Sequence, residues 1–231
     1  MWYLNPIKPI NQTARKGAQN RQNQLTKPTG ALGQMEAVVI ELAGMQGKVC
    51  PTAKQLYICT FAGDHGIANA GVSAYPQAVT RQMLYNFATG GACISVMARH
   101  YGAISQVIDC GSVGEPYAVD GVEQFHIAPQ TQNFLDEPAM TAEQCQKALE
   151  IGKYSVEKAV EQGADIYIAG EMGIGNTTAS SALAGLLLDE HAESLTGLGT
   201  GVDEKTFHYK TQIIGQAIDK YKETCKDNPL L

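Results

Sequence analysis

The sequence predicts an α/β fold: a doubly wound, Rossmann-like parallel sheet with a small helical domain formed by the N-terminal segment. Short apolar runs of strand length alternate with longer segments whose apolar residues are spaced as in a helix, which is typical of a parallel sheet. Glycine makes up 24 of 231 residues, about 10% where roughly 7% is usual. The glycines cluster after the apolar runs, at the strand ends where ligands bind in such sheets.

Residues 1–101 contain one predicted strand between predicted helices. The apolar spacing predicts a helix over 34–43 that ends at Gly44. Residues 56–62 are a short apolar run with β-branched and aromatic side chains, and they predict a buried strand. Two further helices are expected over 77–87 and 92–101.

Residues 102–231 continue the alternation. Strands are expected over 106–110 and 165–169, with a short one over 122–127 between them. Thr141 with Gln144 forms a capping box that opens a long amphipathic helix. A last helix is predicted from Asp203 to about Tyr221, after a second glycine-rich turn at Gly197–Gly201.

The composition excludes several classes of protein. A hydrophobic content of 44% is too high for a disordered chain. No apolar run approaches the roughly 20 residues that span a bilayer, so no membrane partner is expected. With 17 basic and 23 acidic side chains the net charge is −6, which argues against a nucleic-acid binder.

The cysteines and the N-terminus indicate a cellular compartment. The six cysteines contain no C-x-x-C pair, and we expect them to be small buried hydrophobic residues in a reducing environment. Residues 1–23 are polar and lack a continuous apolar core, so they predict no signal peptide. A cytoplasmic location is the expectation that follows.

The strongest local pattern is a glycine-rich turn between a strand and a helix, Gly170-Glu171-Met172-Gly173-Ile174-Gly175-Asn176-Thr177-Thr178. Backbone N–H groups and the positive end of a helix dipole converge at such a turn, which suits a phosphate. It is neither a Walker loop nor G-x-G-x-x-G. The alternative is a tight turn in which Asn176 or Thr177 caps the helix without any ligand.

Two side chains near these turns have two interpretations each. Glu171 lies just before the turn, where a carboxylate serves ribose hydroxyls or a basic ring nitrogen, or is a solvated loop residue. Lys210 lies about two turns into the last helix. It either supplies a charge to a phosphate held by both glycine-rich turns or is a plain surface lysine.

Asp64 and His65 follow the first predicted strand, and an adjacent Asp and His suggests acid–base or metal chemistry. Neighbouring residues of an extended chain, however, point apart. The histidines show no metal-ligand spacing, so neither a metal nor a cofactor is expected. A structural turn in which Asp64 bonds backbone amides is therefore favoured. No G-x-S-x-G elbow occurs, and nucleophilic hydrolase chemistry has no support.

Five ordered segments carry the clearest functional information. They are K-P-T-G-A-L-G-Q-M-E from Lys27, F-A-G-D-H-G from Phe61, G-V-S-A-Y-P with V-T-R-Q-M from Gly71, the turn from Gly170, and G-T-G-V-D from Gly199. In this order they resemble the nicotinate-nucleotide–dimethylbenzimidazole phosphoribosyltransferase family of cobalamin biosynthesis. The first segment departs mildly from the family's usual K-P-P-G-S-L-G-R-L-E, and together the segments cover most of the chain.

The resemblance implies a doubly wound α/β domain, a smaller domain built from N- and C-terminal segments, and a homodimer. Residues 1–50 would be the N-terminal helical segment of the small domain, and residues 51–231 a phosphoribosyl-binding domain that is incomplete at its C-terminus. The implied reaction transfers the phosphoribosyl group of nicotinate mononucleotide to 5,6-dimethylbenzimidazole. Its products are α-ribazole 5′-phosphate and nicotinate.

The resemblance also implies site residues. Glu171 would lie in the active site, and Ser73, Tyr75 and Gln82 would lie near the aromatic base. The residues expected around the 5′-phosphate come from both glycine-rich turns and the last helix: Gly173, Gly175, Asn176, Thr177, Thr178, Gly199, Gly201 and Lys210.

One family segment has no counterpart in this sequence. It resembles R-x-G-E-G-T-G-A, and its Glu is the family's general base. The resemblance therefore implies a truncated member in which Glu171 is the remaining candidate base. The alternative function is a catalytically incompetent module that binds a nucleotide phosphate, or a split subunit whose partner supplies the base.

Overall fold

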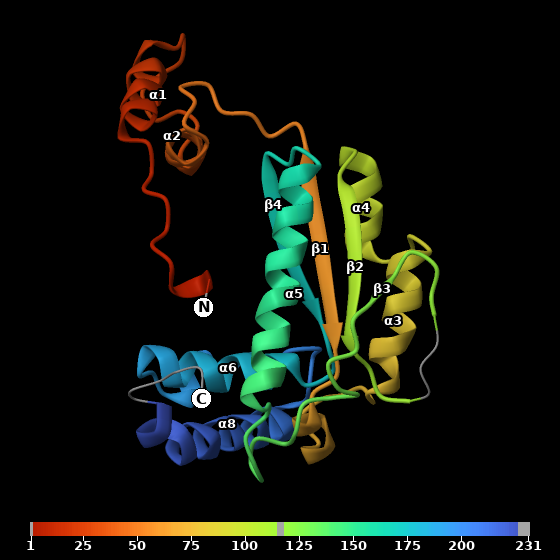
Figure 1. Cartoon of the computed structure of the whole chain (residues 1–231). Coiled ribbons are helices and arrows are strands. Elements are labelled where there is room, and N and C mark those ends of the chain that lie inside the picture. The colour runs from red at the N-terminus through yellow and green to blue at the C-terminus, as the bar shows by residue number, and fades with distance from the viewer. Residues whose placement is uncertain (1, 115–117, 226–231) are drawn as a thin grey trace. The chain divides into compact units, whose positions relative to one another are not determined.

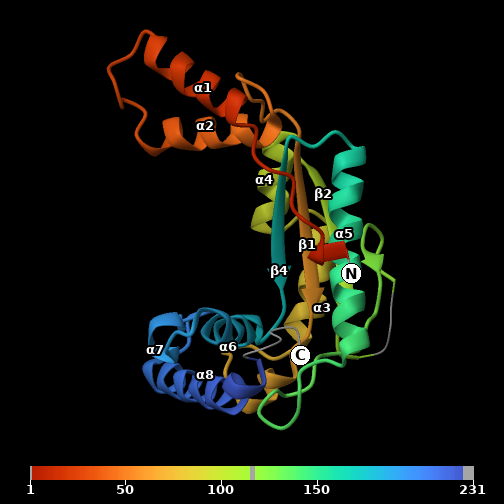
Figure 2. The same cartoon turned by 60° about the vertical axis from the view of Figure 1, so that its left-hand side comes forward.

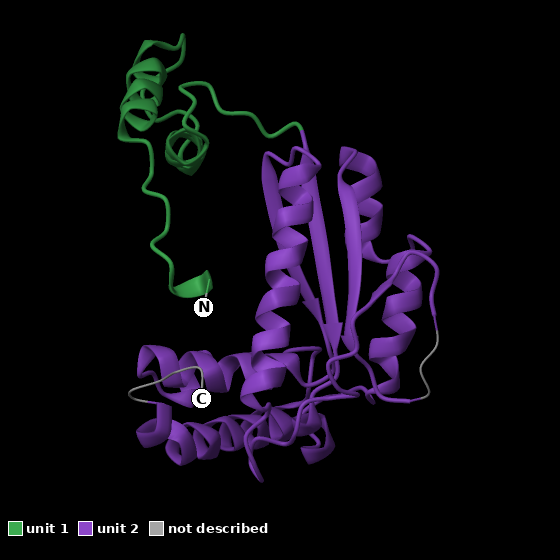
Figure 3. Ribbon diagram, in the orientation of Figure 1, with its two compact units in different colours: residues 1–54 green, residues 55–231 purple. Residues whose placement is uncertain are grey.

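The computed structural model describes residues 2–114 and 118–225. The chain divides into two compact units, Met1–Lys54 and Gln55–Leu231 (Figure 3). The first unit contains a short 3-10 helix, Trp2–Leu4, and two α-helices, α1 (Gln12–Gln24) and α2 (Gln34–Gln46). The assignment of this unit to a small domain stays a prediction.

The two helices of the first unit pack against each other, and Gly44 of α2 lies close to Ile10 and Arg15. The predicted end of the second helix at Gly44 is wrong, since α2 continues to Gln46 and Gly47 ends it with a φ of +66°. A Cβ at Gly44 would lie 2.5 Å from Ile10 Cγ2, so Gly44 permits a close approach rather than ending the helix. A salt bridge of 2.7 Å between Lys27 Nζ and Glu36 Oε1 joins the first and last residues of the K-P-T-G-A-L-G-Q-M-E segment.

The second unit contains a four-stranded parallel sheet in the order β3-β2-β1-β4 (Figure 1). The strands are β1 (Leu56–Gly63), β2 (Ile104–Gly111), β3 (Glu123–Gln124) and β4 (Ile166–Met172). The predicted parallel α/β sheet is therefore confirmed. Because β2 and β4 flank β1 on opposite sides, the winding direction changes between β1 and β4.

Several strand boundaries differ from the prediction, and β2, for example, begins at Ile104 instead of at residue 106. Strand β3 has two residues instead of the expected 122–127, because His126 adopts a φ of +38° and turns the chain out of the ladder. Strand β4 continues to Met172, because its residues pair with β1 as far as Ala62. Glu171 is therefore a strand residue, and the glycine-rich turn begins at Gly173.

Helices cover both faces of the sheet, as the prediction of a doubly wound fold requires (Figures 1 and 2). Helix α5 (Ala142–Glu161) contributes Ile151 and Ala159 to a cluster with Tyr57, Cys59 and Ile108. The opposite face lies against α3 (Ala78–Ala88) and α4 (Cys93–Tyr101), and Leu84 of α3 packs there on Ala62 and Val107. The alternation of side chains along each strand separates these two clusters.

Three helices form a layer at the carboxyl ends of the strands (Figure 1). They are α6 (Asn176–Leu188), α7 (Ala192–Leu195) and α8 (Glu204–Cys225). Their core also includes Ile67, which lies in the 3-10 helix Gly66–Ala70, and Val72, which follows this helix. The capping box predicted for Thr141 and Gln144 is present and opens α5.

The six cysteines are all free. Cys59 is buried as predicted, whereas Cys50 and Cys93 are exposed, so the expectation of burial is wrong for these two. Cys50 lies in the segment that precedes β1 in the chain, and Cys93 is the first residue of α4. Within residues 2–114 and 118–225, no helix combines the length and apolar character needed to cross a membrane.

Candidate functional site

The candidate site lies where β1 and β4 end side by side. The register pairs Phe61 with Glu171 and Ala62 with Met172, so both strands reach the same edge of the sheet. His65 then meets Glu171, with 3.4 Å between His65 Nε2 and Glu171 Oε1. This is the switch point of the sheet, the usual ligand position in doubly wound folds.

Close backbone approach explains the glycines of the first turn. A Cβ at Gly173 would lie 2.0 Å from the carbonyl oxygen of Gly63. Gly175 has a φ of +97°, and a Cβ there would lie 3.2 Å from His65 Cβ. Each additional side chain would push the turn away from the end of β1, so glycine is required at both positions.

Helix α6 begins at this turn without a side-chain cap. Its N-cap residue is Gly175, and no side chain accepts a hydrogen bond from the first turn. The Asn176 side chain instead donates from Nδ2 to Glu171 Oε2. The interpretation of Asn176 or Thr177 as the helix cap is therefore wrong, and the positive end of the helix faces the site uncapped.

Lys210 is buried beneath the same turn. Its side chain is 1% exposed, and Nζ donates to Thr177 Oγ1 over 2.7 Å and to the Gly197 carbonyl over 3.3 Å. Burial lowers the pKa of Lys210, because no carboxylate of the described residues forms an ion pair with it. The interpretation of Lys210 as a plain surface lysine is wrong.

The second glycine-rich turn, Gly197–Gly201, also lies close to Lys210. Gly199 has a φ of +57°, and a Cβ there would lie 3.1 Å from Lys210 Nζ and 3.2 Å from Thr177 Oγ1. Both turns and Lys210 line one small cavity of about 30 Å³. Thr178 lines it too, and its buried hydroxyl has no hydrogen-bond partner in the described part of the chain.

The remaining predicted site residues are spread out. Ser73 lines the small cavity, and its Oγ accepts the N–H of Tyr75 over 3.2 Å. Tyr75 itself is 52% exposed. Gln82 lies along a different hollow on α3, beside Arg81 and Tyr85. Gly201 is absent from the residues that line the small cavity, although its neighbours Thr200 and Val202 do so.

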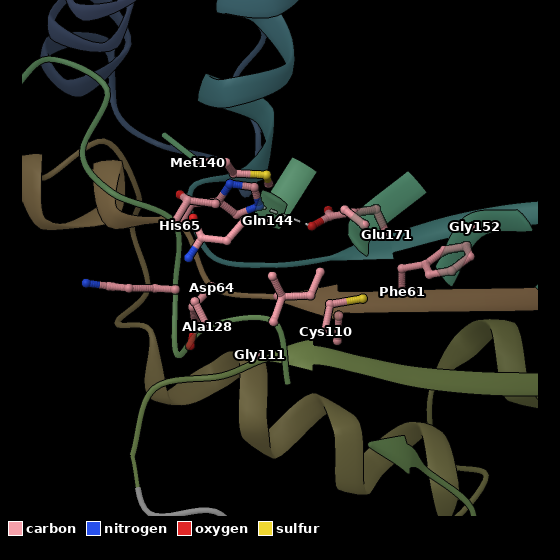
Figure 4. A pocket seen from close by; sticks show the side chains of 16 residues that line it. Phe61, Asp64, His65, Cys110, Gly111, Ala128, Met140, Gln144, Gly152 and Glu171 are labelled. Carbon is pink, nitrogen blue, oxygen red and sulfur yellow. Dashed lines mark hydrogen bonds and ion pairs between the residues drawn. The ribbon is translucent and has the colours of Figure 1, made fainter. Parts of the chain in front are cut away.

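A larger pocket of about 360 Å³ adjoins the His65–Glu171 pair on the face that α5 covers (Figure 4). His65, Gln144 and Glu171 are among the residues that supply polar groups, and most of the wall is apolar. The apolar side chains come from several segments: Phe61, Cys110, Ile127, Met140 and Ala148. Sequence reasoning missed this pocket, because residues so far apart in the chain carry no common pattern.

Two pKa shifts define the chemistry of the pocket. Desolvation raises the pKa of the Glu171 carboxyl, and the hydrogen bond from His65 partly opposes this. The Glu171 side chain nevertheless keeps 42% of its surface exposed, so a ligand can reach it. Burial, with the nearby Asp109, raises the pKa of the Cys110 thiol to about 12, so this sulfur is neutral and no nucleophile.

Asp64 points away from His65, as expected for neighbours on an extended chain. Its Oδ2 accepts the N–H of Val113 over 2.9 Å, and its Oδ1 accepts the hydroxyl of Thr80 over 2.6 Å. The predicted structural turn, in which Asp64 bonds a backbone amide, is confirmed. In the described ranges, no three His, Cys, Asp or Glu side chains lie close enough together to hold a metal ion.

Known proteins are similar to this chain in sequence. The phosphoribosyltransferase family profile matches residues 7–230. The nicotinate-nucleotide–dimethylbenzimidazole phosphoribosyltransferase of Pseudomonas fluorescens (strain SBW25) is 51% identical over 217 residues, which are 94% of this chain. The Pseudomonas putida protein of the same name (strain KT2440) is 48% identical over the same length.

Solved structures agree with the sequence comparison. CobT from Thermus thermophilus superposes with a TM-score of 0.85 and 41% identity over 90% of this chain. The alignments cover 62% of that structure and 62% of each Pseudomonas relative, so this chain spans about three fifths of their length. From the matched sequence and the parallel sheet, the chain belongs to the phosphoribosyltransferase family that includes the nicotinate-nucleotide–dimethylbenzimidazole phosphoribosyltransferases.

Proposed function

We propose that the chain binds nicotinate mononucleotide and transfers its phosphoribosyl group to 5,6-dimethylbenzimidazole, giving α-ribazole 5′-phosphate and nicotinate. The observation that carries the proposal is the buried ammonium of Lys210, which no described carboxylate neutralises. A buried charge is unfavourable without a counter-charge. A phosphate between Thr177 and Gly199 supplies one.

The glycines around Lys210 favour a phosphate, rather than an organic anion, as the group bound beside it. Gly173, Gly175 and Gly199 line the cavity without side chains of their own, and α6 begins beside it with no side-chain cap. Several N–H groups and a positive helix end bind a tetrahedral dianion well. The partnerless Thr178 hydroxyl lies in the same cavity and adds a further donor.

The reaction chemistry matches the groups beside this cavity. In nicotinate mononucleotide the leaving ring is a cationic pyridinium, so it departs without a proton donor. A benzimidazole nitrogen forms the new bond to C1′ of the ribose as the pyridinium bond breaks, and the N–H proton at the other ring nitrogen must be removed. Glu171 is the carboxylate beside the phosphate turn, and we assign it as the proton acceptor.

A specific contact favours a second candidate function. Glu171 already interacts with His65 through Oε1 and with Asn176 through Oε2. These partners suit a carboxylate that orients other groups. In the second candidate the chain binds the nucleotide and a partner subunit supplies the proton acceptor.

Calorimetry tests the phosphate site. We expect nicotinate mononucleotide to bind the intact chain more tightly than nicotinate riboside, which lacks the phosphate. A loss of one charge-assisted contact, about 1.5–3 kcal/mol, corresponds to roughly 10- to 100-fold in affinity. Equal affinities for the two ligands would overturn the phosphate site.

A transfer assay separates the two candidate functions. Nicotinate release is followed after mixing the chain with nicotinate mononucleotide and dimethylbenzimidazole. Glu171 is supported as the base if Glu171→Gln abolishes the release of nicotinate. The control Glu150→Gln, at an exposed position, should retain it. Tight binding without release supports the second candidate instead.

The remaining expectations concern assembly and location. We propose a homodimer and a cytoplasmic location, both of which follow from the resemblance and the sequence. Sedimentation equilibrium of the chain measures its mass directly, and a single species of about 25 kDa would contradict the dimer.

A further inference from the structure

Asp64 is a buried carboxylate that no step of the proposed reaction uses. It lies at the end of β1 and is 2% exposed. Its two oxygens accept hydrogen bonds from different elements, the hydroxyl of Thr80 on α3 and the N–H of Val113 after β2. Asp64 therefore connects three parts of the fold that converge on the strand ends.

Thr80 continues this connection to the phosphate turn. Its side chain is completely buried, and Oγ1 accepts the N–H of Ile174 over 3.1 Å. An ionised carboxylate only accepts hydrogen bonds, so the Thr80 hydroxyl proton points to Asp64. The free lone pairs of Oγ1 then face Ile174, and the donation to Asp64 strengthens Oγ1 as an acceptor.

Ile174 is the central residue of the Gly173–Gly175 turn. The glycines on both sides permit many backbone conformations, so they do not by themselves fix the peptide planes. The bond from the Ile174 N–H to Thr80 holds one of these planes against α3. The direction of the neighbouring N–H groups, which would face the phosphate, depends on that plane.

We infer that Asp64, acting through Thr80, is a positioning residue of the phosphate site. The chain of hydrogen bonds from Ile174 to Thr80 to Asp64 holds the glycine-rich turn in the conformation that receives the 5′-phosphate beside Lys210. The inference rests on the proposed function, and it adds two residues that touch neither the substrate nor the reacting atoms.

The test compares ligands with and without a phosphate. Thr80→Val keeps the shape of the side chain and removes the hydroxyl. We expect its affinity for nicotinate mononucleotide to fall about tenfold, with the affinity for nicotinate riboside unchanged. Thr80→Ser restores the hydroxyl and the affinity. Thr211→Val is the matched control, because among the described residues the Thr211 hydroxyl donates only to the helix carbonyl of Phe207.

The outcomes are distinct. If wild type binds the mononucleotide and the riboside equally, the proposed phosphate site fails. If wild type discriminates and Thr80→Val discriminates as strongly, only the positioning role is overturned. A purely structural role of Thr80 would weaken both ligands together and would also overturn it.

Amide hydrogen exchange covers the case in which Thr80→Val does not fold. In the wild-type chain the Ile174 amide should exchange slowly, since it is bonded to a buried hydroxyl. Exchange of this amide at the rate of an unprotected peptide would overturn the inference without any variant. Protection that is kept in Thr80→Ser supports it.

Discussion

The Nζ atom of Lys210 lies 2.7 Å from Oγ1 of Thr177, although 33 residues separate them in the sequence. This contact joins the second turn of α8 to the first turn of α6, and it places a buried positive charge beside both glycine-rich turns. The phosphate site that we propose depends on this relationship. Replacement of Lys210 therefore distinguishes its effect on the stability of the fold from its effect on ligand affinity.

We expect Lys210→Met to lose about 10- to 100-fold in affinity for nicotinate mononucleotide, because a charge-assisted contact disappears. The free energy of unfolding without ligand should stay equal or rise, because the buried charge is removed. Calorimetry and urea unfolding measure the two effects. Lys205→Met, at an exposed position on the same helix, serves as the control. A large loss of stability in Lys210→Met would contradict this prediction.

The lowered pKa of Lys210 also predicts a pH dependence with a definite sign. Between the lowered pKa of the folded chain and 10.5, the unfolded chain binds more protons than the folded one. The stability of the ligand-free chain should therefore rise with pH through this window. Lys210→Met should lack that rise. Urea unfolding of both proteins at several pH values up to 10.5 provides the measurement.

Glu171 predicts the opposite trend at lower pH. Its pKa is raised above 4.5 by desolvation, so the folded chain binds more protons than the unfolded chain between 4.5 and the raised value. Stability should fall as pH rises through that window, and nicotinate release should increase as Glu171 loses its proton. Glu171→Gln should flatten both profiles. A release profile that keeps its wild-type shape in Glu171→Gln would argue against Glu171 as the titrating base.

Two glycines of the site differ in what surrounds them. Gly175 and Gly201 have φ values of +97° and +88°, and alanine at either position is strained by about 1–3 kcal/mol. A Cβ at Gly175 would in addition crowd His65 and Ile67 at 3.2 Å, whereas nothing lies within 4 Å at Gly201. Urea unfolding should therefore show a larger loss for Gly175→Ala than for Gly201→Ala. Equal losses would mean that the turn can move away from β1.

A buried polar network under α5 tests stability apart from the site. Ser155 is completely buried, and its Oγ lies 2.7 Å from Gln106 Oε1 and 2.8 Å from the Tyr167 hydroxyl. Ser155→Ala should lower the free energy of unfolding by about 1–3 kcal/mol, because it leaves Tyr167 without this partner. Ser194→Ala, at an exposed position, should change it by less than about 0.5 kcal/mol. Ligand affinity should be unchanged in both variants.

Features that depend on neighbouring residues were predictable from the sequence. Strand-length apolar runs alternating with helical spacing predicted the parallel sheet, and Thr141 with Gln144 predicted the start of α5. The glycines after the last strand predicted a turn at the N-terminus of the helix that follows. These predictions succeed because backbone conformation and the periodicity of burial are local properties.

Where the neighbouring residues did not determine where a helix or strand ends, the tertiary structure did. Gly44 allows Ile10 to pack closely instead of ending a helix, and pairing with β1 extends β4 through Glu171. Neither outcome is determined by the residues next to these positions in the chain. Contact with a segment distant in sequence settled both.

The sequence by itself determined the parallel α/β fold and the glycine-rich turn at the carboxyl end of its last strand, the turn at which we propose that a phosphate binds. Only the tertiary structure decided that Lys210 is buried, that His65 faces Glu171, and that Asp64 reaches the turn through Thr80. The physical reason is that charge burial and hydrogen-bond partners are non-local. They exist only after β1, β4 and α8 have brought distant side chains to one edge of the sheet.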